Sequence, residues 1–163
     1  MRSFASDNNS GVHPEVMAAI IEANRDHAAG YGDDRWTERA AECVRQVFGG
    51  EARPFFLFNG TGANSVALQA VTRSFHSILC AATAHIYVDE CNAPARMTGC
   101  QLIAVATPDG KLTPDLLRPH LQHFGDCHHA QPGAVYISQA TELGTLYTCL
   151  LYTSDAADER SSV

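Results

Sequence analysis

Residues 59–64, which read NGTGAN, combine two glycines with a threonine hydroxyl at a point where the composition changes. The apolar run FFLF at 55–58 comes before them and is typical of a short strand. Residues 66–71 follow with apolar positions and no helix breaker, as expected of a helix. The pattern therefore predicts a strand, a glycine-rich turn and a helix.

The turn at Gly60, Thr61 and Gly62 has the chemistry of a phosphate site. The first N–H groups of a helix have no partner within it, and the helix dipole favours an anion at that end. Glycines let the anion approach the backbone, and the hydroxyl adds a donor. A turn that serves only strand–helix packing is the alternative, since neither a nucleoside-triphosphate loop nor a complete dinucleotide fingerprint is present.

A second group of reactive side chains lies in residues 120–129. It comprises His120, His123, Cys127, His128 and His129. The HxxH spacing would suit metal ligands on one helix face. Gly125 interrupts the segment, however, and the chain has no CxxC pair, so we expect no metal site here.

Helices and strands alternate along the chain. A first helix is expected to begin at Pro14, and a second to follow a cap at Thr37 and to end at Gly49. A short helix is expected to end at Met97, and a last one to begin at Pro114 after a cap at Thr113, with Leu116, Leu117 and Leu121 facing inward. Strands are expected at 77–82, 101–106 and 134–138, and a loop at 85–90. This order predicts an α/β fold with a mostly parallel sheet. Ligands of such sheets bind at the carboxyl ends of the strands, where we expect the Gly60 turn, the His85 loop and residues 139–145 to meet.

The composition excludes several classes of function. The chain has 163 residues, 45% of them hydrophobic, and a net charge of −7, which argues against nucleic acid as a partner. No apolar run is long enough to cross a membrane, and the N-terminus lacks a signal-peptide core, so we expect a cytoplasmic protein with no membrane partner. Six scattered cysteines without CxxC spacing agree with a reducing compartment.

Six segments in series resemble the low-specificity L-threonine aldolases, pyridoxal-phosphate enzymes of the β-eliminating lyase superfamily. They are FASDNNSGVHPEV at 4–16, GYGDD at 30–34, NGTGAN at 59–64, AHIYVDE at 84–90, GDCHHAQPG at 125–133 and SQATELGTLYT at 138–148. The resemblance implies that residues 1–148 form the N-terminal part of a pyridoxal-phosphate aldolase domain. The implied fold is a partial large domain of the aspartate-aminotransferase type, fold type I, with a mostly parallel sheet.

The resemblance also implies a reaction and its participants. The expected activity is the cleavage of L-threonine or L-allo-threonine to glycine and acetaldehyde, with pyridoxal 5′-phosphate as cofactor and an amino acid as the small-molecule substrate. The family suggests a homo-oligomer, either a dimer or a tetramer. Another pyridoxal-phosphate β-eliminating lyase and a non-catalytic fragment that only binds or dimerises are the alternatives.

Cofactor contacts are implied for four residues. By resemblance, Gly60, Thr61 and Gly62 bind the cofactor phosphate. His85 occupies the place of the imidazole that stacks on the cofactor ring near the substrate hydroxyl, so it is expected to be both a cofactor-binding and a catalytic residue. An ordinary loop histidine is the alternative.

Substrate contacts are implied for three more residues. By resemblance, Ser6 helps to hold the substrate carboxylate, and His128 is a second catalytic histidine linked to the substrate hydroxyl. Tyr31, a substrate-binding residue by the same resemblance, lies in a loop that approaches the active site, either of its own chain or across a dimer interface. His129 competes with His128 for its role. Thr141 and Glu142 either lie near the cofactor ring or only cap the strand end, and for Glu142 we expect the second.

Parts of the family pattern are missing from this sequence. In the family, a lysine binds the cofactor as an imine, an Asp pairs with the pyridine nitrogen and an Arg binds the substrate carboxylate. All three residues lie beyond the segment that corresponds to 138–148. The one lysine, Lys111, lies in the turn PDGKLTP outside every family motif, and we do not expect it to hold the cofactor. We therefore expect the 163-residue polypeptide to lack aldolase activity and the full-length gene product to have it.

The resemblance stops after Thr148. Residues 149–163 read CLLYTSDAADERSSV, and the LYT of 146–148 recurs at 151–153. This stretch resembles translated adapter sequence that contaminates some metagenomic assemblies. We therefore expect 149–163 to be a non-native tail, with a genuine divergent terminus as the alternative.

Overall fold

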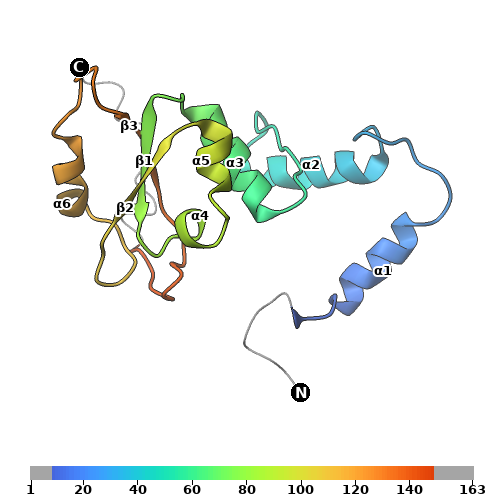
Figure 1. The fold of residues 1–163 in the computed structure, drawn as a ribbon. Helices are drawn as coiled ribbons and strands as arrows, with labels where there is room; N and C mark the ends of the chain where they lie inside the picture. The colour runs from blue at the N-terminus through green and yellow to red at the C-terminus, as the bar shows by residue number, and fades with distance from the viewer. Residues whose placement is uncertain (1–8, 149–163) are drawn as a thin grey trace. The chain divides into compact units, whose positions relative to one another are not determined.

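A computed structural model of the chain describes residues 9–148, so Ser6 and the tail at 149–163 lie outside the described residues. The chain divides into two compact units, Met1–Phe56 and Leu57–Val163. Figure 1 shows the helices and strands of both units. None of the described helices has the length and apolar character needed to cross a membrane.

The first unit contains two helices, α1 at Pro14–Ala23 and α2 at Arg35–Phe48. Pro14 occupies the first turn of α1, and Gly49 ends α2 with a φ of 100°, both as predicted. The predicted cap of α2 is wrong, because Asp34 and not Thr37 caps it. The Asp34 carboxylate accepts hydrogen bonds from the backbone of Trp36 and Thr37 and from the Thr37 hydroxyl, which lower the pKa of Asp34.

The second unit is a small α/β structure. Its elements are α3 (Gly60–Val71), β1 (His76–Ala81), α4 (His85–Val88), α5 (Ala93–Thr98), β2 (Gln101–Val105), α6 (Pro114–Leu117), a 3-10 turn (Arg118–Leu121) and β3 (Gln131–Tyr136). The sheet has the order β2-β1-β3, and β1 pairs in parallel with both neighbours (Figure 1). Leu79 of β1 lies opposite Ile103 of β2 and Val135 of β3. The predicted parallel α/β sheet is confirmed.

Three further local predictions, all in or next to the second unit, are wrong. Residues 55–58 form no strand, and Phe58 is fully exposed, because an apolar run becomes a strand only where another backbone pairs with it. Residues His85–Val88 form the short helix α4 and not a loop. Leu121 is 45% exposed, because α6 gives way to the 3-10 turn and the inward-facing pattern ends at Leu116 and Leu117.

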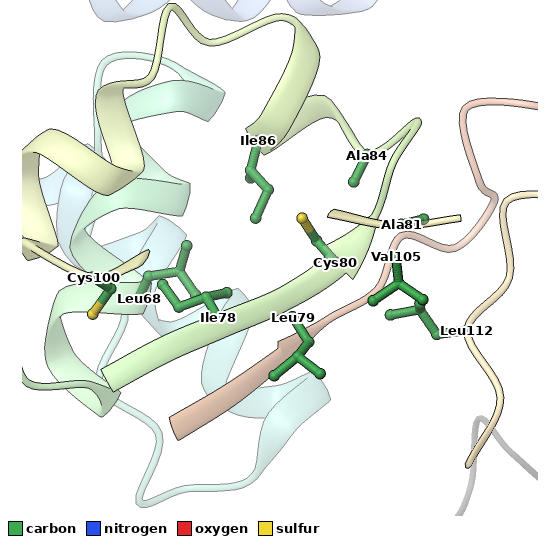
Figure 2. Packing of buried hydrophobic residues seen from close by; sticks show 10 residues of the cluster. All are labelled: Leu68, Ile78, Leu79, Cys80, Ala81, Ala84, Ile86, Cys100, Val105 and Leu112. Carbon is green, nitrogen blue, oxygen red and sulfur yellow. The ribbon is translucent and has the colours of Figure 1, made fainter. Parts of the chain in front are cut away.

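The hydrophobic core is built on both faces of β1. Figure 2 shows Ile78 and Cys80 on the face toward Leu68 of α3 and Ile86 of α4, with Leu79 on the opposite face. This alternation follows from the pleat of a strand, which sends successive side chains to opposite faces. Burial on both faces explains why residues 78–81 of β1 are all apolar, as expected for the central strand of a parallel sheet.

The core position of Ile78 predicts a large effect of truncation there. Ile78 is 0% exposed, so Ile78→Ala should lower the free energy of unfolding by about 2–5 kcal/mol through lost transfer energy and a residual cavity. Urea unfolding followed by circular dichroism measures the change. Ile137 belongs to the same unit and is 50% exposed, so Ile137→Ala is the matched control, with an expected loss below about 1 kcal/mol. Equal losses in the two variants would contradict the described core.

Candidate active site

The carboxyl ends of the three parallel strands meet at one edge of the sheet. Helix α4 follows β1 there, the turn at Asp109 and Gly110 follows β2, and residues 137–148 follow β3. The Thr145 hydroxyl donates to the Asp109 carbonyl at 2.6 Å, and the Tyr147 hydroxyl accepts from the backbone of Leu112 at 2.8 Å. These bonds fix the segment after β3 against the turn after β2.

The glycine-rich turn opens α3 as predicted. Asn59 is its N-cap, and the Asn59 side chain accepts a hydrogen bond from the N–H of Gly62 at 2.8 Å. The N–H groups of Gly60 and Thr61 have no intrahelical partner and remain available for an anion. A Cβ placed on Gly60 would meet no atom within 4 Å, so this backbone is open to a ligand. The turn therefore fits a phosphate.

His85 begins α4, and three carboxylates lie around it. Its backbone N–H donates to Glu142 Oε1 at 2.9 Å. Its ring Nδ1 lies 3.6 Å from Asp89 Oδ2, and its Nε2 lies 4.0 Å from Glu90 Oε1. The side chain is 53% exposed, so a ligand can reach the ring. His85 is thus oriented by its backbone bond to Glu142 and by the two carboxylates near its ring, and about half of its side chain remains accessible to a ligand.

One carboxylate connects the α3 turn with this histidine. The Glu90 side chain is 0% exposed, and its Oε1 accepts a hydrogen bond from Asn64 Nδ2 of α3 at 2.7 Å. Asn64 and Glu90 are 26 residues apart in sequence, and this contact joins the end of the HIYVDE motif to the end of NGTGAN. The predicted meeting of the Gly60 turn and the His85 segment therefore occurs through these two residues.

The segment after β3 supplies further contacts that the sequence did not reveal. Glu142 also accepts from the Ser138 hydroxyl at 3.0 Å, so it does more than end a strand. Thr141 is buried, and its hydroxyl bonds that of Thr145 at 2.7 Å. Because SQATELGT is one of the matching segments, the sequence indicated that its hydroxyls and carboxylate matter. The sequence did not indicate which residues they bind.

The structure does not bring His128 to His85. His128 is exposed, lies three residues before β3, and its N–H donates to Asp126 Oδ1. Because β1 and β3 are parallel, a residue that precedes β3 lies at the amino edge of the sheet, whereas His85 lies at the carboxyl edge. A strand of six residues separates these edges by about 20 Å. The shared substrate role of the two histidines stays a prediction.

The structure does not test the predicted substrate contacts of Tyr31 and Ser6. Tyr31 lies in the first unit, is fully exposed, and has a φ of 63° in the turn between Gly30 and Gly32. Ser6 lies outside the described residues. Their roles stay predictions.

Part of the histidine-rich segment forms a cluster at the amino edge. Ligand atoms of His123, Asp126 and His129 lie within 4.8 Å of one another. The backbone N–H of His128 and the His129 ring hold the pKa of Asp126 below its ordinary value. The rings of His123 and His129 are stacked with centroids 3.9 Å apart and planes 5° from parallel. The lone pairs of their ring nitrogens therefore lie in two parallel planes. The rings would have to rotate before both could bind one metal ion.

Lys111 lies beyond β2 at the carboxyl edge, but it is engaged elsewhere. Its Nζ lies 3.0 Å from Asp109 Oδ2 and donates to the Leu146 carbonyl at 3.4 Å. Within the described residues no contact joins it to His85. The structure thus gives Lys111 a local structural role beside the turn.

Cys80 lies beneath this edge in the core, where burial raises its pKa to about 11 and the charge of Glu142 adds to the rise. The folded protein therefore stabilises the thiol form, and reaction through the thiolate is suppressed at neutral pH. Cys91 follows α4 and is exposed.

In native protein at pH 8, we expect iodoacetamide to modify Cys91 and to leave Cys80 unmodified. Peptide mass spectrometry measures both sites, and urea should make them equally reactive; equal rates before urea would contradict this burial.

The Glu142 contact predicts a protected amide at His85. Glu142→Ala removes the acceptor and should speed hydrogen exchange of the His85 N–H by about tenfold or more, since a hydrogen bond to a charged group is worth about 1.5–3 kcal/mol. Glu142→Gln is the matched control, because it keeps Oε1 as an acceptor and should retain most of the protection. Amide-resolved exchange measures this. Unchanged exchange in the Ala variant would show that the contact does not form.

Comparisons with known proteins agree with this geometry. Residues 3–150 match the family model described as "Beta-eliminating lyase". The chain is 48% identical over 147 residues to the low specificity L-threonine aldolase of Pseudomonas aeruginosa, covering 90% of this chain and 42% of that protein. It is 31% identical over 128 residues to the enzyme of the same name from Saccharomyces cerevisiae, covering 77% of this chain and 33% of that protein.

A solved structure of Leishmania major threonine aldolase has the same fold over this region. The TM-score is 0.79 at 28% identity, and the match covers 85% of this chain and 41% of that one. The chain thus spans about two fifths of the length of the relatives it matches, and the partial fold type I architecture predicted from the sequence is confirmed. On the family match, this chain belongs to the β-eliminating lyase family, and it is similar to the threonine aldolases named above.

Proposed function

We propose that the intact protein cleaves L-threonine or L-allo-threonine to glycine and acetaldehyde with pyridoxal 5′-phosphate. The observation that carries the proposal is the joining of the α3 turn to His85 through Asn64 and Glu90, in a chain closely similar to named threonine aldolases. A phosphate-binding turn and an accessible imidazole on one sheet edge are the two features that this cofactor and this reaction need.

The residues of this chain have distinct tasks in the proposed site. The N–H groups of Gly60 and Thr61 and the Thr61 hydroxyl would bind the cofactor phosphate, while Gly62 keeps its N–H on the Asn59 cap. A Cβ on Gly62 would lie 3.2 Å from Asn59 Oδ1, so this glycine serves the turn by close packing.

His85 would hold the ring of the cofactor and would take the proton of the substrate hydroxyl. Asp89 lies next to Nδ1 and favours a proton there, which leaves Nε2 as the acceptor. The Glu90 carboxylate, 4.0 Å from Nε2, stabilises the ring once it is protonated. Bound pyridoxal phosphate would supply the electron sink for the Cα–Cβ cleavage.

Two alternative functions compete with threonine cleavage. Another β-eliminating amino-acid lyase is the second candidate, because the matching family model is broader than the aldolases. A non-catalytic role for the 163-residue polypeptide is supported by its single lysine, which is paired with Asp109.

We further propose that the intact protein is a cytoplasmic homo-oligomer. The exposed apolar residues Val16, Ile20 and Ile21 of α1 support an interface between copies, and the free thiols support a reducing compartment.

Threonine-dependent release of acetaldehyde by the purified intact gene product tests the proposal. We expect activity with added pyridoxal phosphate and none from the 163-residue polypeptide alone. His85→Asn should lower kcat by about 10²- to 10⁴-fold, as for the loss of a general base. Thr61→Val should raise the cofactor dissociation constant about tenfold.

His128→Asn is the matched histidine control. Its position at the amino edge predicts nearly unchanged kcat, whereas a fall equal to that of His85→Asn would support the role implied by the family resemblance. An intact protein that binds the cofactor but releases no acetaldehyde, and instead eliminates from another amino acid, would favour the second candidate.

A further inference from the structure

Glu90 is a buried carboxylate in which one of the two oxygens has no hydrogen-bond partner among the described residues. Its side chain is 0% exposed, its Oε1 is bonded to Asn64, and its Oε2 has no partner within the described residues. Burying a carboxylate costs free energy unless hydrogen bonds or an opposite charge compensate it. A glutamate in this state therefore calls for an explanation beyond packing.

The groups around Glu90 indicate what that explanation is. Asn64 lies one helical turn after Gly60, so the two residues share a face of α3 near the phosphate turn. On the other side, His85 is the one basic side chain within 4.0 Å of Glu90 in the described part of the chain. Asp89 and Glu142 also face His85, the first at Nδ1 and the second at the backbone N–H. Of these three carboxylates, Glu90 alone is fully buried and alone reaches α3.

We propose that Glu90 is a positioning residue with two separable tasks in the proposed reaction. Through Oε1 it holds Asn64, and with it the first turn of α3, in place for the cofactor phosphate. Through its charge it faces Nε2 of His85 and stabilises the protonated ring. The inference rests on the proposed function, and it adds a residue that touches neither the phosphate nor the substrate hydroxyl.

Two conservative variants separate the tasks. Glu90→Gln keeps an oxygen acceptor for Asn64 and removes the charge that faces His85. Glu90→Asp keeps the charge but withdraws it by one methylene group, so the 2.7 Å bond to Asn64 is lost or lengthened. Measured on the intact protein, the cofactor dissociation constant comes from an absorbance titration without substrate, and kcat and its pH profile come from acetaldehyde release.

The two variants should fail in different ways. For Glu90→Gln we expect a cofactor dissociation constant within about threefold of the parent, and kcat lowered at least about tenfold with an altered pH profile. For Glu90→Asp we expect the dissociation constant to rise at least about tenfold. Asn64→Ala should weaken the cofactor to a similar extent, and adding Glu90→Asp to it should weaken it no further, because the two residues act through one contact.

Asp115→Asn of α6 is the matched control, since it removes one negative charge from the same unit at a side chain that is 92% exposed and lies outside the site. Its effect on kcat should be below about threefold, as for an exposed ion pair. Equal losses of cofactor affinity and kcat in Glu90→Gln and Glu90→Asp, in step with lowered melting temperatures, would overturn the proposal in favour of a purely structural role. Parent-like values in both variants would also overturn it.

The titration distinguishes this inference from the proposed function. If the parent binds the cofactor but cleaves no threonine, the aldolase proposal fails, while weakened cofactor binding in Glu90→Asp and Asn64→Ala still supports the positioning of α3. If the parent cleaves threonine and these two variants bind the cofactor normally, the aldolase proposal stands and the Glu90 inference fails.

Discussion

The parallel pairing of β1 with both of its neighbours is the constraint on which the second unit depends. β1 is buried on both faces, so its side chains leave little freedom in register or direction. Parallel direction then determines which segments can meet, because whatever follows a strand lies at one edge and whatever precedes it lies at the other. The α4 helix and residues 137–148 meet for this reason, although more than 50 residues separate His85 from Glu142.

The same constraint explains what the sequence could and could not predict. The apolar run of β1 and the glycine turn of α3 were predictable, because strand composition and helix starts are local properties. The position of His128 was not, since a histidine three residues before a strand looks in sequence much like one just after it. The direction of β3 relative to β1 decides between the two edges, and direction is a tertiary property.

Local competition accounts for the smaller errors. Asp34 and Thr37 are both good capping residues, and they are three positions apart. Once the helix begins at Arg35, the Asp34 carboxylate reaches two backbone N–H groups and the Thr37 hydroxyl, so the threonine becomes a donor to the cap. The FFLF run at 55–58 failed for a different reason, because composition cannot supply the neighbouring backbone that a strand requires.

The position of His85 depends on its surroundings more than on its own helix. A helix of four residues has too few internal hydrogen bonds to be stable by itself, since nucleation costs more than one turn returns. Ile86 anchors α4 by inserting into the core at 0% exposure, and Glu142 binds the N–H of His85 at its start. The imidazole is therefore fixed by the core on one side and by the segment after β3 on the other. A change at Ile86 or at Glu142 should therefore move the imidazole although neither side chain contacts the ring.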